Sequence, residues 1–209
     1  MARNVAYGAC LYAGQICIST QQILVKDELY YDFREALKFA MHEIKCGNCD
    51  EDGVVNGPMI SSDEISRIDE WVREACAMGA TLLTGGVVLD SVHNIYAPTI
   101  LEHVNEEMKV VSEEAFAPIA VLRKFSSMDD AIQMVNASRY GLQTGLYSSN
   151  EGVIEKAYLQ LDVGALIINN VPGYRHDAMP YGGVKDSGEG REGPRYALED
   201  MTEPKLIVY

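Results

Sequence analysis

Apolar residues recur every three or four positions in two long stretches of the chain, which predicts two amphipathic helices. We expect Asp27 to cap the first of them. Ser61 and Glu64 predict a capping box at the start of the second, which runs to about Met78. The apolar positions are Leu29, Phe33, Leu37, Ala40 and Ile44 in the first helix, and Ile65, Ile68, Val72 and Ala75 in the second. Further helices are expected over residues 4–14, 128–135, 150–161 and 191–198.

Short apolar runs between these helices predict strands. The expected strands are residues 18–26, 81–83, 94–101, 119–125, 142–147 and 164–169, with a last one at 205–209. Helices that alternate with short apolar strands favour an α/β domain, in which a mostly parallel sheet is flanked by helices. Residues 45–57 and 170–189 predict loops, and a loop as long as the second is usually functional.

The composition is that of an ordinary globular protein, with 47% hydrophobic and 23% charged residues in 209 positions. Seventeen basic residues against 31 acidic ones give a net charge of −14, which disfavours nucleic acids and anionic membranes as partners. No apolar run approaches the roughly 18 residues of a membrane-spanning helix. The first four residues carry no apolar signal region.

The five cysteines are odd in number and irregularly spaced, so they do not predict a disulfide framework. Reduced thiols favour a cytoplasmic protein. Cys46 and Cys49 form a Cys-x-x-Cys pair with His42 one turn before it, but a structural zinc ion generally needs four ligands. We therefore interpret both as ordinary loop thiols and expect no metal.

Cys17 has a more specific setting than the other cysteines. It follows Gly14 and Gln15 and immediately precedes a predicted strand, so a tight approach that needs a glycine leads to the thiol. A thiol at such a point is accessible to a substrate while the chain around it stays fixed. The alternative is a buried structural thiol, the usual fate of a free cysteine.

This segment resembles the aldehyde dehydrogenase superfamily, whose nucleophile lies in a Gly-Gln-x-Cys sequence. Later stretches match the same family in order along nearly the whole chain. They are Gly57-Pro58-Met59-Ile60, Gly85-Gly86, Ala97-Pro98-Thr99, Glu113-Glu114-Ala115-Phe116-Ala117-Pro118, Tyr140-Gly141-Leu142 and Met179-Pro180-Tyr181-Gly182-Gly183. The chain is under half the length of a full family member, so it is similar to the C-terminal catalytic domain alone, without the Rossmann-type NAD(P)-binding domain. We assign residues 1–200 to that domain and 201–209 to a tail, and the first helix looks interrupted, as in a shortened gene.

The resemblance implies that Cys17 is the nucleophile in the oxidation of a small aldehyde. Its thiolate adds to the carbonyl carbon to give a thiohemiacetal, hydride leaves to the nicotinamide, and water hydrolyses the resulting thioester to the acid. The backbone N–H of Cys17 is a candidate oxyanion donor. The family's general base is a glutamate well before the cysteine, and none of the sixteen residues before Cys17 is acidic. We therefore expect the isolated chain to be inactive.

Glu114 and Phe116 match the Glu-x-Phe of the family, in which the glutamate holds the nicotinamide ribose. This implies NAD or NADP as the cofactor, with the determinants of that choice outside the chain. The alternative for Glu113 and Glu114 is a solvated acidic turn.

Four residues are candidates for the substrate pocket. Ile16 and Ile18 flank the nucleophile and should line the approach of the aldehyde, while Tyr181 matches an aromatic pocket wall of the family. Arg175 lies where many relatives have an apolar residue, and a guanidinium there favours an anionic or oxygen-rich aldehyde. The alternative is a surface arginine paired with Asp177. Ile16 counts against a phosphorylated aldehyde, because that branch usually has arginine just before its cysteine.

The apolar tail at 205–209 resembles the family strands that join a sheet shared between subunits, so we expect a homo-oligomer or a disordered tail. Two other functions remain open. One is an aldehyde dehydrogenase that passes its thioester to coenzyme A, for which the missing base matters less. The other is a non-catalytic assembly domain that keeps the fold without the chemistry.

Overall fold

The computed structural model describes residues 1–209 and contains a four-stranded sheet at its centre. The strands lie in the order β1 (Gln22–Lys26), β6 (Ile119–Phe125), β5 (Thr99–Glu102) and β2 (Thr81–Thr84). The pairs β1–β6 and β6–β5 are parallel, and β2 pairs antiparallel with β5. The prediction of an α/β fold with a mostly parallel sheet flanked by helices is confirmed.

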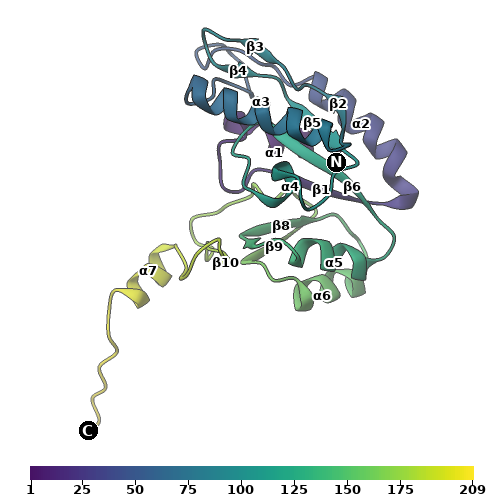
Figure 1. Cartoon of the computed structure of the whole chain (residues 1–209). Helices are drawn as coiled ribbons and strands as arrows, with labels where there is room; N and C mark the ends of the chain where they lie inside the picture. Colours follow the sequence, from purple (N-terminus) through teal and green to yellow (C-terminus); the bar gives the residue numbers. More distant parts are fainter.

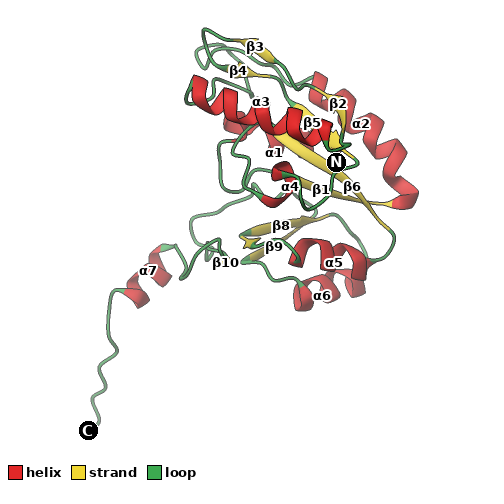
Figure 2. Cartoon of the chain, viewed as in Figure 1, coloured by secondary structure: helices red, strands yellow, loops and turns green.

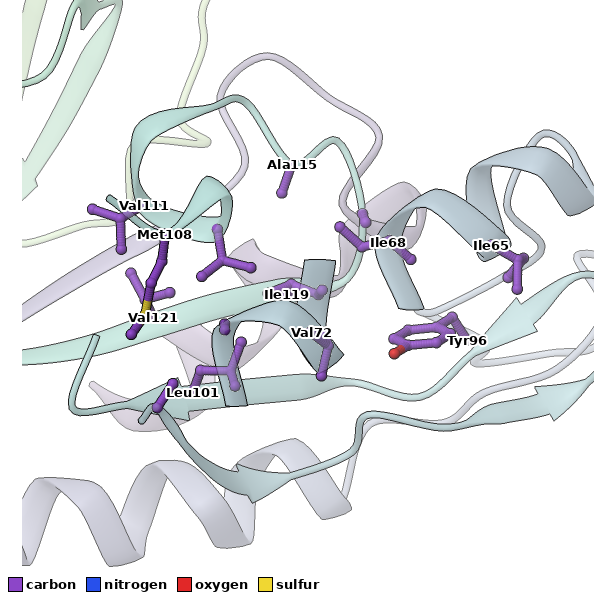
Figure 3. Packing of buried hydrophobic residues seen from close by; sticks show 14 of the residues in the cluster. Ile65, Ile68, Val72, Tyr96, Leu101, Met108, Val111, Ala115, Ile119 and Val121 are labelled. Atoms are coloured by element: carbon purple, nitrogen blue, oxygen red, sulfur yellow. The ribbon is translucent and has the colours of Figure 1, made fainter. Parts of the chain in front are cut away.

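Helices cover both faces of this sheet (Figures 1 and 2). α3 (Ser62–Ala77) and the short α4 (Lys109–Ser112) lie on one face, and α1 (Ala2–Cys10) and α2 (Tyr30–His42) lie on the other. The central strand β6 shows why two layers are needed, because its side chains alternate between them. Ile119 and Val121 join the α3 cluster, which Figure 3 shows, while Ala120 and Leu122 join the α1–α2 cluster.

A smaller region follows the sheet in sequence. It pairs β8 (Gln143–Leu146) in parallel with β9 (Ala165–Ile168), and α5 (Met128–Asn136) and α6 (Glu151–Gln160) accompany this pair. Two short antiparallel pairs complete the strands: β7 (Tyr140–Gly141) with β10 (Val184–Lys185), and β3 (Val88–Asp90) with β4 (Ile95–Tyr96). The chain ends in α7 (Pro194–Asp200) and an exposed tail that extends away from the rest (Figure 1).

The α3 prediction was the most accurate. Ile65, Ile68, Val72 and Ala75 are all buried, and the Ser61 side chain accepts a hydrogen bond from the N–H of Glu64 at 3.3 Å. The capping box is only half formed, because the Glu64 carboxylate binds Arg67 instead of reaching back to Ser61. The strong local periodicity was enough to predict this helix from the sequence.

Other boundaries differ from the prediction. Asp27 begins a short 3₁₀ turn, η2 (Asp27–Leu29), and does not cap α2, so Leu29 falls outside the helix and is 60% exposed. The strand expected over residues 18–26 begins at Gln22, because the turn of residues 16–19 occupies the first of these positions. Residues 205–209 form no strand within this chain, because no sheet edge of the chain lies beside the extended tail. No helix is both long and apolar enough to cross a bilayer.

Candidate active site

The segment before Cys17 leaves α1 through an unusual backbone path. Tyr12 and Ala13, in η1 (Leu11–Gly14), both have φ of 55°, and Gly14 follows with φ of 67°. A Cβ added to Gly14 would lie 2.0 Å from the carbonyl oxygen of Ala117. Only glycine permits this approach, so the loop packs directly on the chain that follows Phe116.

Gln15 holds the same loop from its other side. Its Oε1 accepts a hydrogen bond from the N–H of Ile60 at 2.8 Å, and its Nε2 donates to the carbonyls of Tyr12 and Pro58 at 3.2 and 3.3 Å. The Gly-Gln pair therefore has two separate structural roles, close approach by Gly14 and loop bracing by Gln15. The sequence pattern indicated the glycine but not the part played by Gln15.

Cys17 lies in a turn closed by a hydrogen bond from the N–H of Ser19 to the carbonyl of Ile16 at 2.9 Å. The Cys17 side chain is exposed, whereas Ile18, the next residue of the turn, is only 5% exposed. The two central residues of the turn thus face opposite ways. Ile18 is packed inside and is not among the residues that line the small pocket beside Cys17, whereas Ile16 is. The place of Ile18 on the approach of the aldehyde stays a prediction.

A small pocket of about 20 Å³ brings Cys17 together with the Glu-x-Phe segment, although 97 positions separate Cys17 from Glu114 in sequence. Ile16 also lines it. The full lining is Gly14, Ile16, Cys17, Ser19, Gln21, Glu114, Phe116, Ala117 and Ile119. The only acidic side chain in this set is Glu114.

The two adjacent glutamates differ in their partners. The Glu113 carboxylate lies 3.2 Å from the Arg139 guanidinium, whereas Glu114 makes no hydrogen bond or ion pair and is exposed. Phe116 is 39% exposed and has φ of 48°, so a strained turn presents its ring beside that free carboxylate. This arrangement leaves a carboxylate available to accept hydroxyl hydrogen bonds next to a ring that a sugar or nicotinamide can pack on.

Tyr181 contacts the nucleophile candidate from another direction. Its Oη lies 2.6 Å from the Cys17 Sγ, and the residue is only 6% exposed. Burial, with the hydrogen bond to Cys17 as the second cause, raises the pKa of Tyr181 above its ordinary value. The phenol is therefore protonated at neutral pH and able to donate to a thiolate.

Arg175 lies over the Tyr181 ring, with the guanidinium carbon 4.0 Å from the ring centroid. Its Nη2 donates to the Glu192 carboxylate at 2.9 Å. The partner of Arg175 is thus Glu192 and not the Asp177 considered from sequence, because Glu192 pairs with Tyr181 through two backbone hydrogen bonds of 3.1 and 2.6 Å. No sequence pattern indicated Glu192, since only the fold brings it to this position.

The Cys-x-x-Cys pair lies in the loop after α2. Cys46 Sγ accepts from the Asn56 amide at 3.3 Å, and burial raises the pKa of this thiol. His42 contacts Thr84 at 3.3 Å. No group of three or more His, Cys, Asp or Glu side chains is arranged to hold a metal ion.

The α/β sheet, the glycine-dependent loop and the exposed thiol beside a free carboxylate together define a candidate cysteine-dependent active site. The model of the "Aldehyde dehydrogenase family" matches residues 1–207, and the chain belongs to this family. The 3-sulfolactaldehyde dehydrogenase of Priestia aryabhattai is 44% identical over 94% of the chain, and aspartate-semialdehyde dehydrogenase 1 of Pseudomonas canavaninivorans is 36% identical over 96%.

Among solved structures, aldehyde dehydrogenase 21 from Physcomitrella patens, in complex with the reaction product succinate, superposes with a TM-score of 0.95. It is 37% identical and the match covers 100% of this chain and 43% of that one. The chain spans 40% and 42% of the lengths of the two relatives named above.

Proposed function

We propose that this chain is the catalytic part of an NAD(P)-dependent aldehyde dehydrogenase that oxidises a small aldehyde to its acid. The observation that carries the proposal is the shared pocket, in which the exposed Cys17 thiol lies beside the free Glu114 carboxylate and the exposed Phe116 ring. Family membership gives the reaction class, and the pocket gives each residue a role within it.

Cys17 is the nucleophile in this proposal. Its thiolate attacks the aldehyde carbon to form a thiohemiacetal, which is oxidised to a thioester and then hydrolysed. The N–H of Cys17 donates no hydrogen bond within the chain, so it is free to stabilise the oxyanion that forms on attack. The Tyr181 hydroxyl, 2.6 Å from the Cys17 Sγ, donates a hydrogen bond to the sulfur before attack.

The free carboxylate and the adjacent ring fit a nicotinamide cofactor. Glu114 would accept hydrogen bonds from the two ribose hydroxyls, and Phe116 would pack beside the sugar or the nicotinamide. When bound, the cofactor accepts the hydride from the substrate carbon. NAD and NADP differ far from this ribose, so these residues do not discriminate between them.

Thioester hydrolysis needs a base, and the only acidic side chain lining the pocket is Glu114, which we assign to the cofactor. We therefore propose that the 209-residue chain alone does not oxidise aldehydes and that a base and a cofactor domain complete the site. Turnover of an aldehyde with NAD or NADP by the purified chain would contradict this statement.

We further propose an anionic aldehyde as the substrate. Several relatives are named for 3-sulfolactaldehyde, sulfoacetaldehyde, aspartate semialdehyde or succinate semialdehyde, which carry a sulfonate or carboxylate, and one is named for the neutral lactaldehyde. Tyr181 lies between the two groups that would bind such a substrate. Its hydroxyl contacts Cys17, which would bind the aldehyde end, and its ring packs against Arg175, which would bind the anionic end. Only the Tyr181 side chain thus separates the Arg175 guanidinium from the Cys17 sulfur. The Arg175 side chain is 43% exposed, so it can exchange its ion pair with Glu192 for one with a substrate anion.

Thiol reactivity tests the nucleophile directly on this chain. Cys17 should be alkylated by iodoacetamide faster than Cys49, which is also exposed, and faster than Cys10, Cys46 and Cys76, as measured by peptide mass spectrometry. Equal rates at Cys17 and Cys49 would favour a non-catalytic assembly domain. In a full-length form, acid as the product supports the proposed hydrolysis, and acyl-coenzyme A would show the alternative transfer.

A further inference from the structure

Gln21 joins the two halves of the pocket through a single side chain. It lies four residues after Cys17, and its backbone carbonyl accepts a hydrogen bond from the N–H of Val121 at 2.8 Å, which fixes it beside the central strand. The side chain then reaches 92–94 positions along the sequence, to the peptide groups on either side of Glu114.

The Gln21 amide uses both of its ends on that turn. Nε2 donates to the carbonyl of Glu113 at 2.7 Å, and Oε1 accepts from the N–H of Ala115 at 3.0 Å. A longer contact of 3.4 Å joins Nε2 to the carbonyl of Val110. The residue held between the two short contacts is Glu114, whose own side chain has no partner.

A second side chain completes the hold on Ala115. Arg67, on α3, donates from Nη2 to the carbonyl of Ala115 at 2.7 Å, and its guanidinium carbon lies 4.5 Å from the Trp71 ring centroid. Ala115 is 1% exposed, so its N–H and carbonyl would be costly to leave without partners. Gln21 satisfies the first and Arg67 the second.

The turn needs such support because Phe116 has φ of 48°, a backbone conformation that non-glycine residues rarely adopt. Its backbone is fixed on both sides while the Glu114 and Phe116 side chains remain exposed. This is the arrangement expected of a preorganised binding site, in which the scaffold and not the ligand holds the contact residues in place.

We infer that Gln21 is a positioning residue that fixes the Glu114–Phe116 turn relative to Cys17, and thereby sets how well the pocket binds the nicotinamide ribose. The identity of the ligand rests on the proposed function. The clamp, by which we mean the hydrogen bonds of Gln21 to the peptide groups on either side of Glu114, rests on the structure of this chain alone. No catalytic step is assigned to Gln21.

The test replaces Gln21 by Met, which keeps the length of the side chain and removes both hydrogen-bonding ends. Gln22→Met is the matched control, because the Gln22 amide donates to the carbonyl of Val111 at 3.2 Å and touches none of the peptide groups around Glu114. Hydrogen exchange of the Ala115 amide, measured on the chain itself, should accelerate about tenfold or more in Gln21→Met and stay unchanged in Gln22→Met.

The second measurement uses a full-length form that carries a cofactor domain. Gln21→Met should raise the KM for the nicotinamide cofactor about tenfold while the KM for the aldehyde and the alkylation rate of Cys17 change less than about twofold. A merely structural role of Gln21 would instead lower the melting temperature of Gln21→Met and shift all of its kinetic constants together, and that result would overturn the inference.

The outcomes separate the two levels of the argument. Unchanged Ala115 exchange in Gln21→Met overturns the inference, and so does faster exchange with an unchanged KM for the cofactor. Faster exchange in Gln21→Met, in a full-length protein that binds no nicotinamide cofactor at all, leaves the clamp standing and overturns the proposed function instead.

Discussion

The turn at residues 113–117 and the loop at 170–192 both contact the Cys17 segment, but they are held in different ways. In the turn, Ala115 and Ala117 are 1% and 2% exposed, and the side chains of Gln21, just before β1, and of Arg67, on α3, hold the backbone of Ala115. In the loop, residues 173–178 are all exposed, and Gln143 holds its start by donating to the carbonyls of Pro172 and Tyr174. The turn that we assign to the cofactor is therefore built into the core, whereas the stretch 173–178, which carries Arg175, lies on the surface.

This difference has a physical consequence for specificity. The nicotinamide ribose is common to NAD and NADP, so a rigid core-supported turn suits it, whereas substrates differ and a surface loop tolerates changes without loss of the fold. Cys17 belongs to both regions, since Gly14 packs it onto the turn and Tyr181 contacts it from the loop.

The largest expected effect comes from removing the atom that the two regions share. Cys17→Ser in a full-length form should lower the dehydrogenase rate by at least about a thousandfold, because an alcohol is a far weaker nucleophile than a thiolate. Cys49→Ser, also at an exposed thiol, should leave the rate unchanged. Comparable rates for Cys17→Ser and the parent protein in a steady-state assay would show that Cys17 is not the nucleophile.

A buried ion pair between α2 and β5 tests how much the stability of the central sheet depends on its buried contacts. Arg34 Nη2 lies 2.7 Å from the Glu102 carboxylate, which is 3% exposed and also accepts from Tyr30 at 2.8 Å. Arg34→Met leaves that carboxylate buried with one neutral partner, so we expect a loss of about 3 kcal/mol in the free energy of unfolding at pH 7. Urea denaturation measures it.

The pH dependence follows from the direction of the Glu102 shift. Hydrogen bonding to Arg34 is the main cause that lowers the pKa of Glu102 in the folded protein. A lowered folded pKa contributes stability that is fully present above about pH 5 and lost as the pH falls through the folded pKa. The difference in the free energy of unfolding between the parent protein and Arg34→Met should therefore narrow below about pH 4. A difference that stays constant with pH would mean that Glu102 is not the group involved.

Gly14→Ala probes the contact by which the nucleophile loop rests on the turn. The added Cβ would lie 2.0 Å from the Ala117 carbonyl oxygen, whereas at Gly53, which has φ of 77°, a Cβ would meet nothing within 4 Å. Both substitutions strain a left-handed backbone, so their difference isolates the clash. We expect Gly14→Ala to cost about 2 kcal/mol more than Gly53→Ala in thermal or urea unfolding. Equal costs would indicate that the loop does not need to lie against the turn.

The sequence predicted those parts of the molecule that local spacing or an ordered motif determines. The α3 stripe required only the periodicity of Ile65, Ile68 and Val72, and the pairing of Cys17 with Glu114 and Phe116 required only the order of matched segments. Glu192 and Gln21 were not predicted as partners of the site. The contact of Glu192 with Arg175 spans 17 residues of sequence, and that of Gln21 with Glu113 spans 92. Both arise from tertiary packing, which no local sequence pattern records.

The start of α2 and the tail illustrate two other limits. Asp27 is a reasonable helix cap by residue type, but a 3₁₀ turn intervenes and moves the helix start to Tyr30. The apolar residues 206–209 have strand propensity, yet a strand requires a neighbouring edge to pair with and this chain offers them none. Propensity describes the segment alone, whereas strand formation depends on the partner.

The smallest expected effect concerns the loop and tests whether the substrate side carries charge specificity. Arg175→Phe in a full-length form should raise the KM about tenfold for an aldehyde that bears a carboxylate or sulfonate, because a charge-assisted contact of the substrate anion is lost. The KM for a neutral aldehyde of similar size and the KM for the cofactor should change less than about twofold, since the turn at 113–117 does not contact Arg175. Arg195→Phe, at another exposed arginine paired to a glutamate, is the control and should change none of these values. If Arg175→Phe leaves the KM for the acidic aldehyde unchanged, Arg175 is a surface arginine held by Glu192, and the specificity of the loop must come from other side chains.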